Sequence, residues 1–323
     1  MSYQRKNRKK SFPFKWGIIA LSLLAIGTLS VLHFNNQNQI ASADVSIVLL
    51  NDTVTKQTAL VADKSSICVY TDLQSMEGQN LPANSQATIL EYFTLESENE
   101  SSLFATIDVD GETFYIPATH LELVQTNDIN QYIAQLGYPH VDLTADIVEI
   151  FEQESYATES GDPIGVIIHD TGVEYSTIDS EVTYMIDNYD ELCVFVHSFI
   201  DNDTILEIAD ASYKAQGAGP NGNSSYIQFE MTHVYTQDDF AMQLANAAYY
   251  TAYMLNEYQL PVTVGEEDGS GTVWTHEMVS EYLGGTDHID PTDYWDSSAA
   301  ELFDTTYDVD DFVQLVQSYY NMM

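Results

Sequence analysis

Three short and almost wholly apolar runs constrain the second half of the chain more than any other feature. They are "IGVIIHD" from Ile164, "CVFVHSFI" from Cys193 and "SYIQFEMTHV" from Ser225. Continuous apolar runs of this length are typical of strands that are buried on both faces of a sheet. Because the runs alternate with helical patterns, the sequence predicts an α/β domain with a central mixed sheet flanked by helices.

Two long segments have the apolar spacing of amphipathic helices. In residues 236–260, apolar side chains recur every three or four positions, and Thr236 is the predicted N-cap. Residues 308–320 close the chain with a second such pattern. Shorter helices are predicted in "NDINQYIAQLGY", with Asn127 or Asp128 as N-cap, and in "TADIVEIFEQESY".

Residues 44–125 have a different pattern. Short runs rich in Val, Ile, Tyr, Phe and Thr alternate with polar or Gly-containing breaks, and "DG" at Asp110–Gly111 is a hairpin signal. Several short strands in so few residues predict a small all-β barrel. The chain is therefore expected to divide into this barrel over 44–125 and the α/β domain over 126–323.

Charge is distributed very unevenly along the chain. Six of the nine Lys and Arg residues precede residue 16, whereas all 50 Asp and Glu residues follow it. The basic residues lead into an apolar run, Trp16–Leu32, which is the pattern of an export segment whose N-terminus stays in the cytoplasm. "ASAD" fits signal-peptidase cleavage after Ala43, while the run's length and its polar spacer favour an uncleaved transmembrane anchor. Residues 1–43 are thus predicted to place the rest outside the cell, on the membrane face or in the cell wall, or secreted.

The acidic remainder excludes one class of partner. After residue 15 only three Lys residues accompany the 50 acids, so a nucleic-acid contact surface is not expected. The acidity favours solubility, with adaptation to an acidic or salty exterior as the alternative. Cys68 and Cys193 are predicted to be unpaired buried thiols rather than a disulfide.

Histidines and one carboxylate occupy ends of predicted elements or loops. His169 ends the first buried-type strand, His276 follows a glycine-rich turn, and His288 and Asp290 lie in "LGGTDHIDPTDYW". Three such ligands with an open fourth position are what a catalytic zinc site requires. On spacing alone, the alternative is a set of unrelated surface or core histidines.

Glu230 lies in one of the predicted strands. Alternation in "SYIQFEM" places it on the face opposite Phe229, where its carboxylate must face a polar site or solvent. Beside a metal centre it would serve as a general base, whereas on an edge strand it would be solvated. His233 falls on the apolar face and is predicted to be structural.

Several blocks together carry a family resemblance. They are "IGVIIHDTG", "FVHSFID", "GAGPNGNSSYIQFE", "AAYYTAYML" and "TVWTHEMVSEYLGGTDHIDPTDYW". In this order they resemble the zinc-dependent N-acetylmuramoyl-L-alanine amidases of the type 2 amidase and peptidoglycan-recognition superfamily, in its Gram-positive autolysin branch. The resemblance covers roughly residues 140–300.

The resemblance implies a role for each candidate residue. His169, His276 and Asp290 match the family's Zn²⁺ ligands. Glu230 matches its catalytic glutamate, and His288 matches the histidine that polarises the scissile carbonyl. The implied reaction is hydrolysis of the amide between N-acetylmuramic acid and L-alanine in peptidoglycan, by zinc-activated water with a glutamate general base.

Some residues depart from the pattern, and some readings stay open. Gln216 replaces a common aromatic residue, Asp170 replaces a frequent glutamate, and His197 is expected to pack or to support the site. "DGETFYIPATHLEL" resembles bacterial Src-homology-3-like wall-binding domains, with a simple spacer as the alternative. The alternatives for the whole chain are an inactive peptidoglycan-recognition protein and a zinc peptidase acting within the stem peptide.

Overall fold

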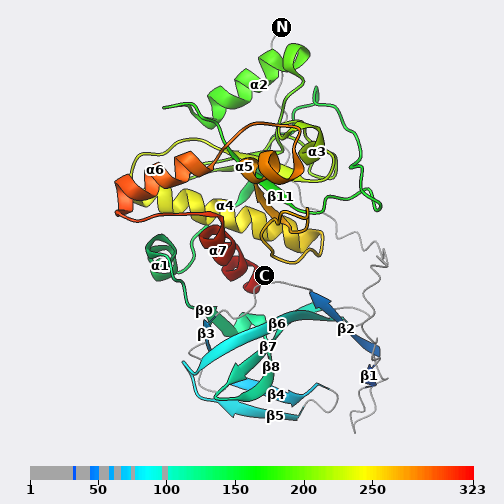
Figure 1. Ribbon diagram of the computed structural model, residues 1–323, viewed down its shortest axis with the longest axis vertical. Helices are drawn as coiled ribbons and strands as arrows, with labels where there is room; N and C mark the ends of the chain where they lie inside the picture. The colour runs from blue at the N-terminus through cyan, green and yellow to red at the C-terminus, as the bar shows by residue number, and fades with distance from the viewer. Residues whose placement is uncertain (1–31, 34–43, 51–57, 62–66, 74–76, 97–100) are drawn as a thin grey trace. The chain divides into compact units, whose positions relative to one another are not determined.

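The computed structural model describes residues 32–33, 44–50, 58–61, 67–73, 77–96 and 101–323. Contacts divide the chain into two units (Figure 1). One contains Gln125–Tyr319, and the other contains the strands that precede Gln125 together with Tyr320–Met323. No helix in the described part is both long and apolar enough to cross a membrane. Nearly all of the predicted export segment lies outside the described residues.

The N-terminal unit is built from antiparallel strands. They are β1 (Leu32–His33), β2 (Asp44–Leu50), β3 (Thr58–Val61), β4 (Ile67–Asp72), β5 (Glu77–Leu81), β6 (Gln86–Glu96), β7 (Ser101–Val109), β8 (Glu112–Pro117) and β9 (Leu121–Leu123), with the short helix η1 (Ala118–His120) before β9. Their order is β1-β2-β6-β7-β8-β4-β5, and β3 pairs with both β6 and β9. The predicted hairpin is confirmed: Asp110 and Gly111 join β7 to β8, both with positive φ.

The second unit has a six-stranded mixed sheet, as predicted. Its strands are β10 (Leu143–Ala145), β11 (Val166–Asp170), β12 (Ser198–Ile200), β13 (Ile205–Glu207), β14 (Ile227–Met231) and β15 (Val273–Thr275), in the order β10-β13-β12-β14-β11-β15. Only the β12–β13 pair is antiparallel. Strands β12, β14, β11 and β15 therefore all end at the same edge of the sheet.

Helices surround this sheet. They are α1 (Asp128–Gln135), α2 (Ile178–Leu192), α3 (Gly219–Asn223), α4 (Gln237–Glu257), α5 (His276–Met278), the π-helical turn η2 (Val279–Leu283), α6 (Thr292–Phe303) and α7 (Val309–Asn321). The predicted caps of α1 and α4 are confirmed, since Asn127 accepts from the Ile129 N–H and Thr236 accepts from the Asp239 N–H.

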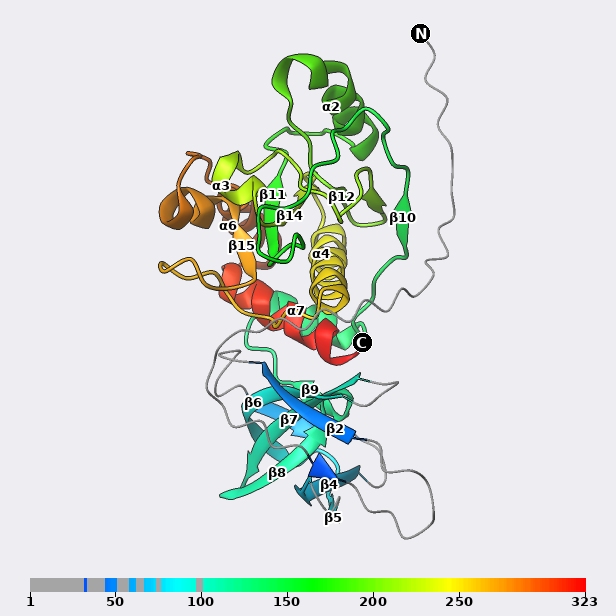
Figure 2. The same ribbon diagram turned by 90° about the vertical axis from the view of Figure 1, so that its right-hand side faces the viewer.

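Helix α4 covers one face of the sheet. It contacts β11, β12 and β13 (Figures 1 and 2), and its Tyr250 ring packs edge-on against Phe229 of β14 at 5.5 Å. Because Phe229 faces α4, its neighbours along β14, Gln228 and Glu230, face the opposite side. The fold thus leaves the second face of β14 and β11 for the polar residues that the sequence singled out.

Two predictions are wrong. The segment "TADIVEIFEQESY" is not a helix, because the Asp146 and Val148 N–H groups donate to the carbonyls of Glu207 and Ile208 and so continue the extended pairing of β10. Both cysteines are unpaired, as expected, but exposed rather than buried. Cys68 alternates outward on β4, and Cys193 caps α2 in a left-handed conformation.

Candidate active site

Three neighbouring parallel strands bring the first three candidate residues together. On β11 and β14, His169 is in register with Glu230, so both side chains lie on the face opposite α4. On β15, Thr275 pairs with Ile168, and His276 follows directly at the level of His169. Ligand sites in such sheets lie at the carboxyl ends of the strands, and these residues lie there.

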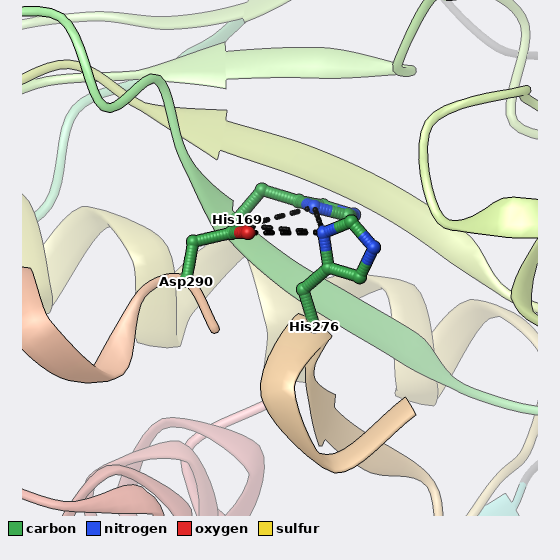
Figure 3. A group of neighbouring side chains, drawn as sticks. All are labelled: His169, His276 and Asp290. Carbon is green, nitrogen blue, oxygen red and sulfur yellow. Dashed lines mark hydrogen bonds and ion pairs between the residues drawn. The ribbon is translucent and has the colours of Figure 1, made fainter. Parts of the chain in front are cut away.

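Asp290 reaches the same point from the loop between η2 and α6. Its Oδ2 lies 3.1 Å from His169 Nδ1, and its Oδ1 lies 3.1 Å from His276 Nδ1 (Figure 3). The two histidine Nδ1 atoms are 2.9 Å apart. The Asp290 carbonyl accepts from the Glu277 N–H, which fixes the loop to α5.

The donor set of this cluster fits a metal cation. His169 and His276 are buried and Asp290 is partly buried, and their ligand atoms all lie within 4.8 Å of one another. The Nδ1 atoms of the two neutral imidazoles lie 2.9 Å apart. At this distance they repel each other if both carry a lone pair or both carry a hydrogen, and they attract only if one carries each. A tetrahedral zinc site with nitrogen and oxygen ligands at the usual bond lengths would separate the ligand atoms by about 3.3 Å. The distances between the ligand atoms of this cluster, 2.9 Å and 3.1 Å, are close to that value.

A threonine that the sequence did not single out orients one of these imidazoles. The His276 Nε2 lies 2.9 Å from the Thr286 hydroxyl, which can accept its N–H and leave the Nδ1 lone pair directed at the cluster. Thr286 lies in the same "GGTDHID" segment as Asp290. Its position near the other ligands was the only signal that could have identified it.

Electrostatics favour the ligand forms of His169 and Asp290. Burial lowers the pKa of His169, although its hydrogen bond to Asp290 acts in the opposite direction. Burial alone would raise the pKa of Asp290, but the hydrogen bonds to His169 and His276 outweigh it and hold that pKa well below its usual range. A neutral imidazole and an ionised carboxylate are the species that coordinate a cation.

Glu230 lies beside the cluster without a hydrogen-bond partner. Its Oε2 is inaccessible to solvent and unpaired. Burial raises the pKa of Glu230 well above its usual value, and the charges of Asp290 and Asp170 raise it further. A carboxyl with one buried oxygen and a raised pKa next to a candidate metal site has the properties of a proton-transfer group.

His288 stands at the solvent side of the same cluster. It is 64% exposed, its ring stacks on that of His276 at 4.5 Å, and its Nδ1 lies 3.4 Å from Asp290 Oδ1. The Ser280 hydroxyl donates to the His288 carbonyl at 2.7 Å. The structure therefore brings all five candidate residues into one region.

The two other histidines discussed from the sequence have packing roles. His197 is fully buried, its Nδ1 accepts from the Gln228 N–H at 2.9 Å, and its Nε2 donates to the Tyr213 carbonyl at 2.8 Å. His233 stacks on Tyr294 at 4.2 Å and pairs with Asp170 at 2.7 Å. The prediction that neither is a ligand agrees with these contacts.

His197 makes stability depend on pH. Burial lowers its pKa from 6.5 to about 4, so between these values the unfolded chain binds a proton that the folded chain excludes. We expect the free energy of unfolding to fall by up to about 3 kcal/mol from this group as pH drops through that window. Urea unfolding at several pH values should show a weaker decline in His197→Gln, and equal slopes would contradict this.

Comparisons with known proteins match the part of the chain that contains this site. A sequence model of the family "N-acetylmuramoyl-L-alanine amidase" matches residues 159–293, which include all five candidates. The bifunctional autolysin of Staphylococcus epidermidis is 40% identical over 185 residues, covering 56% of this chain and 14% of the autolysin. Protein Ami of Listeria monocytogenes is 37% identical over 196 residues, covering 61% of this chain and 20% of that protein. The chain thus spans only a small part of these relatives.

One solved structure is covered over most of its own length. The hydrolase AmiA of Staphylococcus aureus, crystallised with its ligand, is 37% identical and superposes with a TM-score of 0.56. The match covers 60% of this chain and 91% of the AmiA chain. Since it includes nearly the whole of that hydrolase at this identity, the chain belongs to the N-acetylmuramoyl-L-alanine amidase family.

Proposed function

We propose that the protein is a zinc-dependent peptidoglycan amidase that hydrolyses the bond between N-acetylmuramic acid and the L-alanine of the stem peptide. The observation that carries this is the convergence of His169, His276 and Asp290 beside the unpaired Glu230 carboxyl. These three side chains would hold the Zn²⁺ ion. The bound ion would polarise the scissile carbonyl and lower the pKa of water at the site.

Glu230 moves the proton in this proposal. Its carboxylate accepts a proton from the attacking water, and the resulting carboxylic acid donates that proton to the leaving amine. The raised pKa of Glu230 supports the second step, because the carboxylic acid keeps its proton until the amine departs, while the charge of a bound cation would favour the carboxylate that the first step needs.

His288 acts on the substrate side. Its exposed ring lies over His276, beside Asp290, where a carbonyl approaching the cluster from solvent would meet it. A protonated or N–H-bearing imidazole in this position donates to the oxyanion that develops on the substrate carbonyl. Asp290 supports this by keeping a negative charge 3.4 Å from the His288 ring.

The remaining parts of the chain fit an enzyme that works outside the cell. We propose that residues 44–125 form a small Src-homology-3-like barrel that binds the wall, and that residues 1–43 export or anchor the protein. The antiparallel strands of that unit support the first proposal. The basic stretch and apolar run support the second. The N-terminal sequence of the exported protein would show whether Ala43 precedes a cleavage site.

One experiment tests the proposed reaction. Purified protein is incubated with cell walls, with zinc or with a chelator, and the released fragments are identified by mass spectrometry. New L-alanine amino termini that disappear with the chelator support the amidase. Wall binding without new termini indicates an inactive recognition protein, and termini within the stem peptide indicate a peptidase; either result contradicts the proposal.

A further inference from the structure

Two tyrosines form an exposed stacked pair in the second unit. The rings of Tyr175 and Tyr235 lie 4.6 Å apart at 20°. Tyr175 is 79% exposed and Tyr235 is 44% exposed. One face of the Tyr175 ring packs on Tyr235, so the exposed surface of Tyr175 is mainly the opposite face of its ring. An aromatic ring that offers a free face to solvent gains little from burial and is available to a ligand.

The loop that carries Tyr175 is held in place. The Tyr235 hydroxyl accepts from the Tyr175 N–H at 2.6 Å and donates to Glu174 Oε2 at 2.9 Å. The Gly172 N–H donates to Asp170 Oδ1 at 2.7 Å. The ring is thus presented by a fixed backbone, so that a ligand would not have to order it on binding.

Tyr175 has a backbone conformation that is unfavourable for its residue type. Its φ is +60°, in the left-handed region where Gly and Asn are favoured and a bulky side chain costs about 1–2 kcal/mol. Strain of this kind is often kept where a side chain has to be displayed for function.

The pair lies at the same edge of the sheet as the candidate active site. Tyr175 is six residues after His169, and Tyr235 is five residues after Glu230. A chain of this length cannot place the Tyr235 Cα more than about 18 Å from that of Glu230. Glu174 also lies 3.8 Å from His233, which pairs with Asp170, the residue after His169 at the end of β11.

We propose that Tyr175 and Tyr235 form a platform that binds a sugar ring of the glycan strand. This rests on the proposed function, in which the scissile amide is attached directly to a sugar and further sugars extend from it in both directions. The apolar C–H face of a pyranose packs on an aromatic ring, while its hydroxyls need polar partners. The Glu174 side chain, 66% exposed beside the pair, can accept hydrogen bonds from those hydroxyls.

A binding experiment tests the platform without relying on catalysis. The probe is a peptide-free β-1,4-linked tetramer of N-acetylglucosamine, titrated calorimetrically into the full chain. The variants are Tyr175→Asn, which suits the left-handed backbone but lacks the ring, and Tyr175→Phe, which keeps the ring. Tyr184→Asn removes a tyrosine that is 57% exposed on α2 and serves as the matched control.

We expect Tyr175→Asn to weaken tetramer binding about 5- to 10-fold, while Tyr175→Phe and Tyr184→Asn bind like the wild type. On wall fragments, the ratio of kcat/KM for long over single-disaccharide substrates should fall in Tyr175→Asn, mainly through KM. The proposal is overturned if the wild type does not bind the tetramer or if Tyr175→Asn binds it equally well. Loss of the amidase reaction with Tyr175-dependent binding intact would reject the proposed function alone.

Discussion

Replacing Glu230 by glutamine is expected to lower kcat on wall fragments by about 10²- to 10⁴-fold while zinc binding remains. The substitution keeps the shape of the side chain but removes the group that accepts and returns a proton in the proposed mechanism. Glu230 is not among the three converging ligand side chains, so the metal content should not change. The measurement is the initial rate of new L-alanine termini, with zinc determined by elemental analysis in the same sample.

The same variant should gain stability when the metal is removed. Because burial raises the pKa of Glu230, its ionised form opposes folding at any pH above the usual carboxyl value of 4.5. Glutamine lacks that charge, so Glu230→Gln should unfold at higher urea concentration than wild type at pH 7, with the difference lost below pH 4.5. Glu267→Gln, an exposed carboxylate away from the site, is the control for both measurements. Wild-type activity in Glu230→Gln would remove this residue from the mechanism.

Much of the fold of the second unit could be predicted because local and tertiary preferences agree there. Strand β11 is a run of buried apolar residues, and the sequence marks it without ambiguity. Helix α4 has a polar cap at Thr236, and its apolar residues pack on the sheet at helical spacing. In both elements the pattern that the sequence shows is the pattern that packing requires.

Other elements differ from what was predicted. Helix α2 is absent from the predicted elements, although Ile178, Val182, Met185, Ile186 and Tyr189 recur at helical spacing and pack on one core cluster. Conversely, residues 144–156 have helical spacing, but pairing with β13 and the stacking of Phe151 on Phe195 at 4.5 Å keep them extended or irregular. Long-range contacts that no local window contains decide the second case.

The candidate site was likewise predictable only in part from the sequence. Family resemblance identifies His169, His276 and Asp290 one by one, but their meeting depends on strand register and on a loop fixed through Glu277. The contact of Thr286 with His276 Nε2 has no sequence signature of its own. Motifs therefore predict which residues to examine, and the fold determines which of them can act on one ion.

Removal of zinc should destabilise the wild type and should have little effect on Asp290→Asn. A ligand that binds only the folded chain stabilises it according to its free concentration, by about 4 kcal/mol at a thousand times its Kd. Asparagine keeps the size of Asp290 but lacks the charge that holds the ion with two neutral imidazoles. Calorimetric unfolding of the full chain, with zinc and with a chelator, should show a transition that shifts in wild type and scarcely moves in Asp290→Asn.

Asp296→Asn provides the matched control, since it removes an exposed carboxylate from α6, six residues beyond Asp290, and should shift like wild type. Activity should show the same difference between the variants. Chelator should inactivate wild type and Asp296→Asn, and zinc should restore both, whereas Asp290→Asn should be inactive throughout. Because Asp290 contacts both imidazoles, its loss removes the only negative charge among the three ligands. If Asp290→Asn shows the full zinc-dependent shift, the carboxylate does not hold the ion, and the three-ligand site proposed here is wrong.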